Sequence, residues 1–154
     1  MFKFILIFLI IQQVCSTDEQ THSLSKHPLF IKIFRLLDQL LLQVHEMQIL
    51  IIRTYDMINE LPYDLRPFYS ECVNETNNVS KIQYSSNLNE AAIIRIPQIK
   101  SQLKQATTIE QQLNIMNITD RIVADISLNT IKPSFSLITE ILDCFKSKSK
   151  LTMV

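Results

Sequence analysis

Apolar side chains recur every three or four residues between Pro28 and Leu61, the spacing that places them along one face of an α-helix. Pro28 fits the first turn of such a helix and Pro62 cannot continue it, so the pattern predicts a helix between these two residues. A continuous helix of this length would extend about 50 Å, so a bend or a break near His45 is an open alternative. The predicted buried face consists of Phe30, Ile33, Phe34, Leu37, Leu40, Leu41, Val44, Met47, Ile51, Tyr55 and Ile58.

A second set of apolar residues in the same segment lies outside this face: Leu36, Leu42, Ile49, Leu50, Ile52 and Met57. A helix that is apolar around most of its circumference is normally central in a bundle, so we expect other helices to surround this one. Charged side chains at Lys32, Arg35, Asp38 and Glu46 interrupt the segment at a spacing that a bilayer would not tolerate cheaply, which argues against a membrane span.

The segment after the first helix contains few apolar residues. Residues 62–85 are predicted to be mainly irregular, and 73–85 are predicted to form an exposed, mobile loop. Asn87 with Glu90 three residues later resembles a capping box, so a helix is expected to begin there, with a kink or restart at Pro97. Its apolar positions are Ile93, Ile94, Ile96, Ile99 and Leu103.

Two further helices follow. Thr107 and Glu110 repeat the capping pattern, and Pro133 suits the start of the last helix. The first of the two should bury Ile109, Leu113, Met116, Ile122, Val123 and Ile126, and the last should bury Phe135, Ile138, Ile141, Leu142 and Phe145. The sequence therefore predicts an all-α fold, a four- to five-helix bundle with a long first helix and up-and-down connectivity, as one domain over 28–147. Residues 148–154 are predicted to be a C-terminal tail.

The N-terminus has the organisation of a secretory signal peptide. Lys3 precedes a run of eight apolar residues, and small residues lie at a predicted cleavage site after Ser16. The run is much shorter than the roughly 20 residues of a spanning helix, which disfavours the alternative of a retained anchor. We expect residues 1–16 to be removed, residues 17–27 to form a flexible arm, and the protein to be secreted and extracellular.

Composition narrows the classes of function. The chain has no glycine, which disfavours tight hairpins and phosphate-binding loops and favours helices joined by loops rich in Asn, Ser and Pro. Basic and acidic residues are equal in number, 15 of each, and loss of Lys3 leaves a net charge near −1. A nucleic-acid-binding protein would carry a basic face, so no nucleic-acid partner is expected.

The secretory compartment gives meaning to the cysteines and to three glycosylation sequons. Cys15 leaves with the signal peptide, so Cys72 and Cys144 are predicted to form one disulfide; two unpaired thiols or a bond between chains are the alternatives. The sequons begin at Asn74, Asn78 and Asn117, and at least one is expected to carry a glycan. Asn117 falls on the predicted solvent side of its helix.

A search for catalytic and metal-binding patterns finds little. His45-Glu46 opens a zinc-protease signature, but Ile49 occupies the position of the second histidine, so the metal site fails. Glu140 and Asp143 lie three residues apart and could share a cation, although such pairs usually form a solvated face. A nucleophile elbow needs glycine, and both mature cysteines are assigned to the disulfide. The sequence therefore predicts no enzyme, no cofactor and no metal.

The leading functional hypothesis is that a secreted, N-glycosylated helical protein binds an unknown protein partner, as a signal or effector, through solvent-facing residues of its first and last helices. The alternative is an extracellular carrier that holds a lipid or another small hydrophobic molecule in its helical core. The basic residues Lys146, Lys148 and Lys150 are expected to form a frayed end that compensates the helix dipole, or to contact acidic glycans or anionic lipid. The organisation is similar to that of short-chain helical cytokines and of small secreted helical proteins of invertebrates. That similarity includes no diagnostic motif and transfers no residue.

Overall fold

The computed structural model describes residues 28–151, and all described secondary structure is helical. The predicted signal peptide, the predicted arm and residues 152–154 lie outside the described part. The helices are α2 (Pro28–Glu60), α3 (Arg66–Ser70), α4 (Glu75–Glu90), α5 (Ile96–Gln105), α6 (Ile109–Ile126) and α7 (Lys132–Leu151). Two π-helical turns, η2 (Ala91–Arg95) and η3 (Ser127–Ile131), join α4 to α5 and α6 to α7 without a break.

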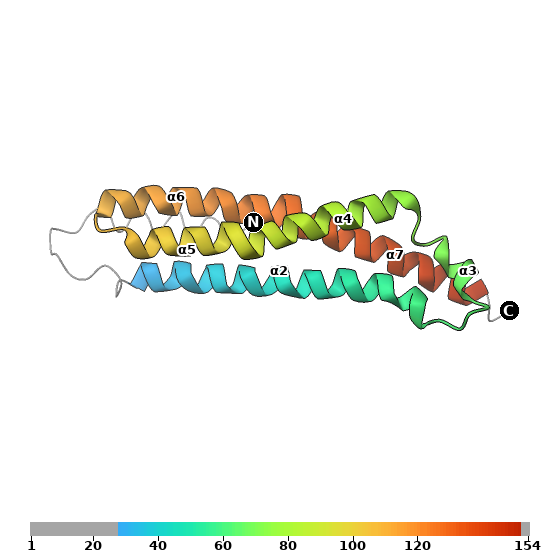
Figure 1. Cartoon of the computed structure of the whole chain (residues 1–154). Coiled ribbons are helices and arrows are strands. Elements are labelled where there is room, and N and C mark those ends of the chain that lie inside the picture. Colours follow the sequence, from blue (N-terminus) through green and yellow to red (C-terminus); the bar gives the residue numbers. More distant parts are fainter. Residues whose placement is uncertain (1–27, 152–154) are drawn as a thin grey trace.

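The bundle is long and narrow because its three long helices lie side by side. In Figure 1, α2 runs along the whole bundle, the α4–η2–α5 helix returns beside it, and the α6–η3–α7 helix runs in the same direction as α2. Short α3 lies at the end where α2 and α4 are connected. The predicted all-α fold, a four- to five-helix bundle with a long first helix and up-and-down order, is confirmed. When α4–η2–α5 and α6–η3–α7 are each counted as one helix, the described residues form four helices, of which α3 is short. Helix α2 is continuous over Pro28–Glu60, so it does not divide near His45.

The two π-helical turns explain how prolines lie inside continuous helices. Pro97 and Pro133 lack the N–H that an α-helix needs at each residue, and their rings crowd the preceding turn. In both helices the residue before the proline bonds one residue further back than in an α-helix. The N–H of Ile96 donates to the Ala91 carbonyl, and the N–H of Lys132 donates to that of Ser127. The sequence had suggested that Pro97 kinks or restarts its helix and that Pro133 begins the last helix. Both prolines instead lie inside continuous helices.

Residues 75–85 are helical, which corrects the loop predicted over 73–85. Asn74 is the N-cap of α4, and its side-chain oxygen accepts the N–H of Asn77 at 2.9 Å. The Tyr55 hydroxyl donates to the Asn77 carbonyl oxygen at 2.5 Å, so a tertiary contact from α2 holds the first turn of α4. Because α4 is polar and only weakly amphipathic, its helical state depends on such contacts and not on its own pattern. The capping box predicted at Asn87 is therefore wrong.

The next helix start is displaced by one residue. Thr108, not Thr107, is the N-cap of α6, and the side chains of Thr108 and Gln111 each bond the backbone of the other. The connections between long helices contain no residue with positive φ among 28–151, in keeping with a chain that has no glycine.

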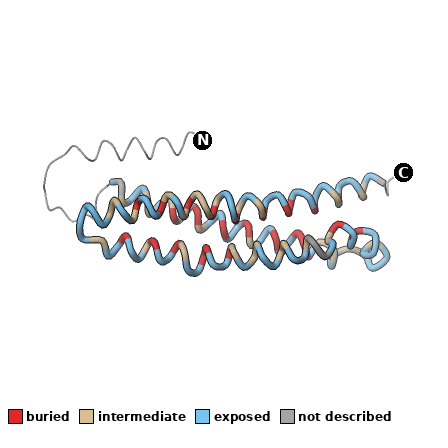
Figure 2. The backbone as a smooth tube through the Cα atoms, turned by 90° about the horizontal axis from the view of Figure 1, so that it is seen from above, coloured by how far each residue is buried: buried red, intermediate tan, exposed pale blue. Residues whose placement is uncertain are grey.

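The core runs along the bundle axis between the three long helices, as the red positions in Figure 2 show. Helix α2 contributes its predicted buried face to the core, and Leu37, Val44 and Ile51 on this face are fully buried. The other two long helices contribute Leu88, Ile96, Ile99, Leu103, Ile126 and Ile141.

Several apolar residues predicted to face inward are exposed instead: Ile93, Ile94, Ile109, Phe135 and Leu142. A π-helical turn contains more residues than an α-helical turn, so it changes which residues of the surrounding sequence face the core. Ile93 and Ile94 lie within such a turn. After the second π-helical turn, Ser134, Leu137 and Ile138 occupy the inner positions and leave Phe135 outside.

Candidate functional site

The disulfide between Cys72 and Cys144 closes one end of the bundle. It joins the residue two positions after α3 to α7, with the two Cα atoms 5.7 Å apart. The Tyr69 ring stacks on Phe145 with the ring centroids 5.1 Å apart; Phe145 follows Cys144 directly, and Tyr69 lies three residues before Cys72. The predicted pairing is confirmed, and its stacked neighbours fasten α3 to α7 by noncovalent contact as well.

Lys148 contributes to the same end, although it was predicted to belong to a tail. Helix α7 continues to Leu151, so the predicted domain boundary at 147 falls inside it. The Lys148 ammonium group donates to the Phe68 carbonyl oxygen at 2.5 Å and to the Glu71 carboxylate at 2.6 Å, and it lies over the Phe68 ring. This hydrogen bond and the positive charge of Lys148 lower the pKa of the Glu71 carboxyl group.

All three sequon asparagines reach the surface. Asn74 caps α4 and Asn78 lies in its first turn, both exposed. Asn117 is exposed on α6; it lies seven residues after Glu110 and four before Arg121, so helix periodicity puts it on the same face as these two residues. Within the third sequon, however, Thr119 is buried, and its hydroxyl donates to the Ile115 carbonyl oxygen at 2.7 Å. Glycan attachment at these residues therefore stays a prediction, and Asn117 would have to be modified before α6 packs.

The residues considered for chemistry do not come together. His45 is exposed on α2, its Nδ1 atom 3.0 Å from the Gln48 side-chain oxygen. Glu140 and Asp143 are both exposed on α7. Among residues 28–151 there is no group of three or more His, Cys, Asp or Glu side chains placed to hold a metal ion.

Two described groups have pKa values raised by burial, and neither forms part of a catalytic arrangement. Burial raises the pKa of the Tyr55 hydroxyl to about 12, and this hydroxyl donates a hydrogen bond to the Asn77 carbonyl oxygen. Burial also raises the pKa of the Asp120 carboxyl group. The Asp125 carboxylate has a lowered pKa because Asn129 and Arg95 donate hydrogen bonds to it, at 2.6 Å each. This last cluster connects the two π-helical turns across the bundle.

A hollow of about 490 Å³ lies between α4 and the η3–α7 segment and opens to solvent. Most of its lining residues are polar: Asn77, Ser80, Tyr84, Lys132, Ser136 and Glu140. A site for a lipid is lined predominantly by apolar side chains and encloses most of the ligand. The volume would suffice for a small ligand, but the lining does not match the hydrophobic molecule that the carrier hypothesis requires.

The outer side of α2 carries the apolar residues that were expected to be covered by other helices. Leu42, Ile49 and Ile52 are 59%, 49% and 55% exposed. His45 and Asp56 lie in the same row, so the five residues follow one another at steps of three, four, three and four. We call this row the α2 outer strip. The strip corrects the prediction that α2 is surrounded. The main face packs inward, but four of the six residues of the second apolar set face solvent: Leu42, Ile49, Leu50 and Ile52.

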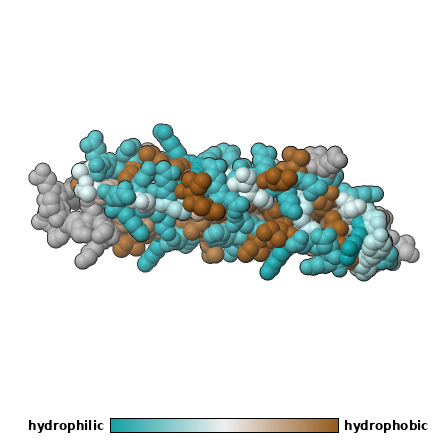
Figure 3. All heavy atoms as spheres, in the orientation of Figure 1, coloured by the Kyte–Doolittle hydropathy of each residue, from teal (hydrophilic) through white to brown (hydrophobic). Residues whose placement is uncertain are grey.

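Charged residues border the strip. Arg35, Glu46 and Arg53 are exposed on the same helix, and Gln39 lies between the first two. On the face of the molecule shown in Figure 3, apolar side chains reach the surface in small groups separated by hydrophilic ones. Protein contacts made by a helix commonly consist of exposed aliphatic residues with charged residues beside them. Sequence reasoning found these aliphatic residues but assigned them to the interior.

No helix within residues 28–151 combines the length and apolarity needed to cross a bilayer. No protein-family model, no curated protein and no solved structure matches this chain.

Proposed function

We propose that the protein is secreted, is N-glycosylated, and acts by binding another protein through the α2 outer strip, without catalysing a reaction. The observation that carries the proposal is the solvent exposure of Leu42, Ile49 and Ile52 in a single row of a 33-residue helix. Complete burial of such a side chain is worth about 1.5–3 kcal/mol relative to full exposure, and these three, already about half buried, would each gain roughly half of that. The inner face of α2 is fixed by the core, so the outer row is presented without reorganisation of the helix.

Protein binding is favoured over the carrier hypothesis by where the apolar surface lies. The hollow between α4 and α7 is open and mostly polar, whereas the exposed aliphatic residues of α2 form a convex row. A convex row suits the groove or helix of another protein, and an enclosed pocket suits a small hydrophobic molecule.

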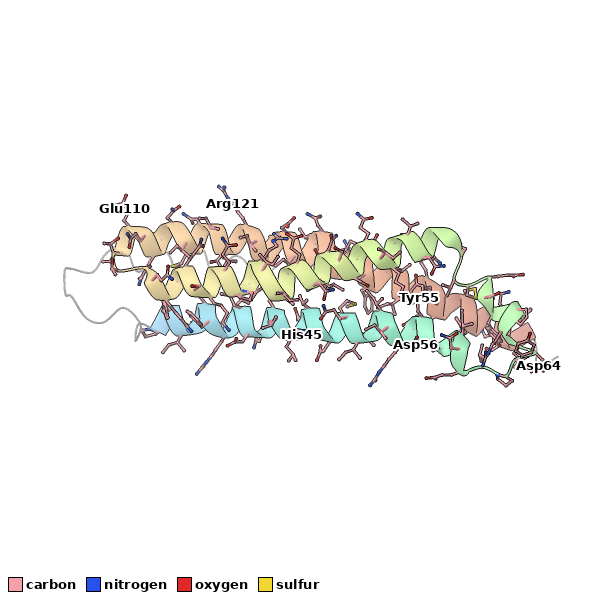
Figure 4. All side chains as sticks on the ribbon, in the orientation of Figure 1. His45, Tyr55, Asp56, Asp64, Glu110 and Arg121 are labelled. Atoms are coloured by element: carbon pink, nitrogen blue, oxygen red, sulfur yellow. A yellow bond between two sulfur atoms is a disulfide. The ribbon has the colours of Figure 1, made fainter. Side chains whose placement is uncertain are left out.

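Site-directed photo-crosslinking tests this function. A photoreactive amino acid at Gln39, beside the strip, should give a covalent adduct when the secreted protein is incubated with extracellular fluid of its source. The same amino acid at Arg121, which projects from α6 in Figure 4, is the matched control and should give none. Alanine substitution of Arg35 or Arg53 should reduce the Gln39 adduct, and Ile49→Ser should abolish it. The absence of an adduct at Gln39, or its persistence with Ile49→Ser, would refute the proposed surface.

The expected secretion and modification have a separate test. Intact mass spectrometry of the protein from eukaryotic cells, before and after deglycosylation, reports cleavage after Ser16, the mass of the disulfide and the occupancy of each sequon. An intracellular product with an intact leader would contradict the secretory part of the proposal and leave the binding surface to be tested on its own.

A further inference from the structure

We infer that the α2 outer strip binds a second copy of this chain, with the two α2 helices antiparallel. This inference rests on the proposed function, because it names the partner of the same strip. It is argued from how the apolar and charged residues of one α2 helix match those of another.

The spacing of the strip is that of a coiled-coil seam. Leu42, His45, Ile49, Ile52 and Asp56 alternate between steps of three and four residues, which keeps a row facing a partner helix. On the side of the row away from the bundle lie Glu46 and Arg53, each one residue after a member of the strip, where flanking side chains of a coiled coil meet across the contact. The inner face of α2 uses a different row for the core, so both contacts can exist together.

One antiparallel register matches every central layer. If the two-fold axis passes between Leu50 and Ile51, Ile49 of each copy lies opposite Ile52 of the other, which forms two aliphatic layers at the centre. In the same register His45 of each copy lies opposite Asp56 of the other, so an imidazole N–H can donate to a carboxylate. Figure 4 shows both residues on α2, His45 near the middle and Asp56 nearer the Glu60 end, as such a pairing requires.

The flanking charges select the same register. Antiparallel helices bring the outer flanking positions into pairs, and here Glu46 of each copy meets Arg53 of the other, twice across the two-fold axis. A shift by one heptad in one direction would place Glu46 against Glu46. A shift in the other direction would place Arg53 against Arg53. Both alternatives create like-charge pairs, which suppress them.

A parallel arrangement is disfavoured by the strip itself. In a parallel pair each residue faces its own counterpart, so Asp56 would meet Asp56 and His45 would meet His45. Such layers place like groups together at the centre of the contact. The charge pattern of α2 is therefore complementary to that of an antiparallel copy of α2 and not to that of a parallel copy.

The contact extends over roughly five turns of α2 and contains few apolar layers, so the dimer should be reversible and depend on protein concentration. Sedimentation velocity of the complete secreted protein over a wide concentration range should show monomer and dimer in exchange. Ile49→Ser should remove the dimer, because it destroys both central layers at once. Ile93→Ser is the matched control, since Ile93 is exposed on η2, and it should leave the dimer unchanged.

Charge reversal provides the sharper test. Glu46→Arg and Arg53→Glu, introduced singly, each create two like-charge pairs and should weaken the dimer about tenfold. The two changes combined in one chain restore opposite charges across the axis and should return the dissociation constant to that of the unmodified protein. Circular dichroism checks that each variant folds. A double variant no stronger than the single ones would overturn the register.

Orientation is measured with a spin label at position 39, which borders the strip and avoids its layers. The antiparallel register places the two labels about 35 Å apart along the helix axis, whereas a parallel pair places them about 10 Å apart. A short distance, or a protein that is monomeric at every concentration, would overturn the inference.

The crosslinking experiment at Gln39 separates failure of this inference from failure of the proposed function. An adduct of twice the chain mass supports self-association. An adduct of any other mass, with a monomeric chain, overturns the inference and retains binding of a different protein. No adduct at all contradicts the proposed function itself.

Discussion

The ammonium group of Lys148 on α7 lies 2.6 Å from the Glu71 carboxylate, which follows α3, although 77 residues separate the two in sequence. The pair lies at the same end of the bundle as the disulfide, and its lysine is far less exposed than its carboxylate. A charge held in this way ties the position of α3 to the state of ionisation of a single carboxyl group.

Stability should therefore depend on pH through Glu71. Its pKa is lower in the folded than in the unfolded protein, so its contribution is present above the ordinary pKa of glutamate and is lost as the pH falls through the folded value. Glu71→Gln should lower the free energy of unfolding near pH 7 and should converge with the unmodified protein in acid. Urea denaturation at pH 7, 5, 4 and 3 measures the difference. A difference that stays constant over this range would contradict the role of the ion pair.

Loss of the disulfide should be more costly than loss of any surface contact. The bond joins residues 72 positions apart, and the chain-entropy model assigns roughly 4 kcal/mol to a loop of this length. The double variant Cys72→Ser/Cys144→Ser should lose about this free energy of unfolding, measured with urea. Reduction of the unmodified protein provides the control and should give the same loss. An unchanged melting temperature would show that the bond adds no stability.

Two adjacent isoleucines on α2 should respond in opposite ways. Ile51 is fully buried and Ile52 is 55% exposed. Ile51→Ala should cost about 2–5 kcal/mol because it leaves a cavity between the long helices. Ile52→Ala should change the free energy of unfolding by less than about 0.5 kcal/mol and should instead weaken partner binding. Urea denaturation and sedimentation of the two variants test this division, which equal destabilisation would contradict.

The π-helical turn η2 should tolerate the loss of one residue. Deletion of Ile93 together with Pro97→Ala removes the extra residue of the turn and restores the missing N–H, so α4 and α5 can keep their inner faces in a regular α-helix. Deletion of Gln43 from α2 is the matched control, and it rotates every later residue of that helix by about 100°. The first variant should unfold cooperatively and the second should lose its cooperative transition, as followed by circular dichroism. Equal damage in both would refute the account of η2.

The first helix and the disulfide could be predicted because their signals are local and strong. Leu37, Val44 and Ile51 repeat with the period of a helix, and a predicted secretory leader, which would leave two cysteines, favours one bond. Helix α4 could not be predicted in this way, because its stability comes from contacts such as the one between Tyr55 and Asn77 and not from its own polar sequence.

The π-helical turns were missed for a different reason. Pro97 and Pro133 signalled a disturbance, but a proline alone does not distinguish a helix that ends from one that accommodates the ring. Ile49 and Ile52 were predicted to be covered because the second apolar set was identified by composition alone, and the spacing of its members along the helix was not considered. Reading those residues together with His45 and Asp56 would have shown a second row on the opposite side of the helix.

The two ends of the bundle are fastened differently. The disulfide, the Tyr69–Phe145 stack and the Lys148 ion pair all lie at the end where α3 packs. Toward the opposite end the described contacts between α2 and α5 are noncovalent: Lys100 pairs with Asp38, and Lys100 and Lys104 lie over the Phe34 ring. In a molecule this narrow each core layer touches mainly the layers next to it, so separation can begin at one end and advance along the axis. We expect amide hydrogens to exchange fastest near Gln105 and Ile109 and progressively more slowly toward Cys144. The protein would then unfold directionally, from the connection between α5 and α6 toward the disulfide.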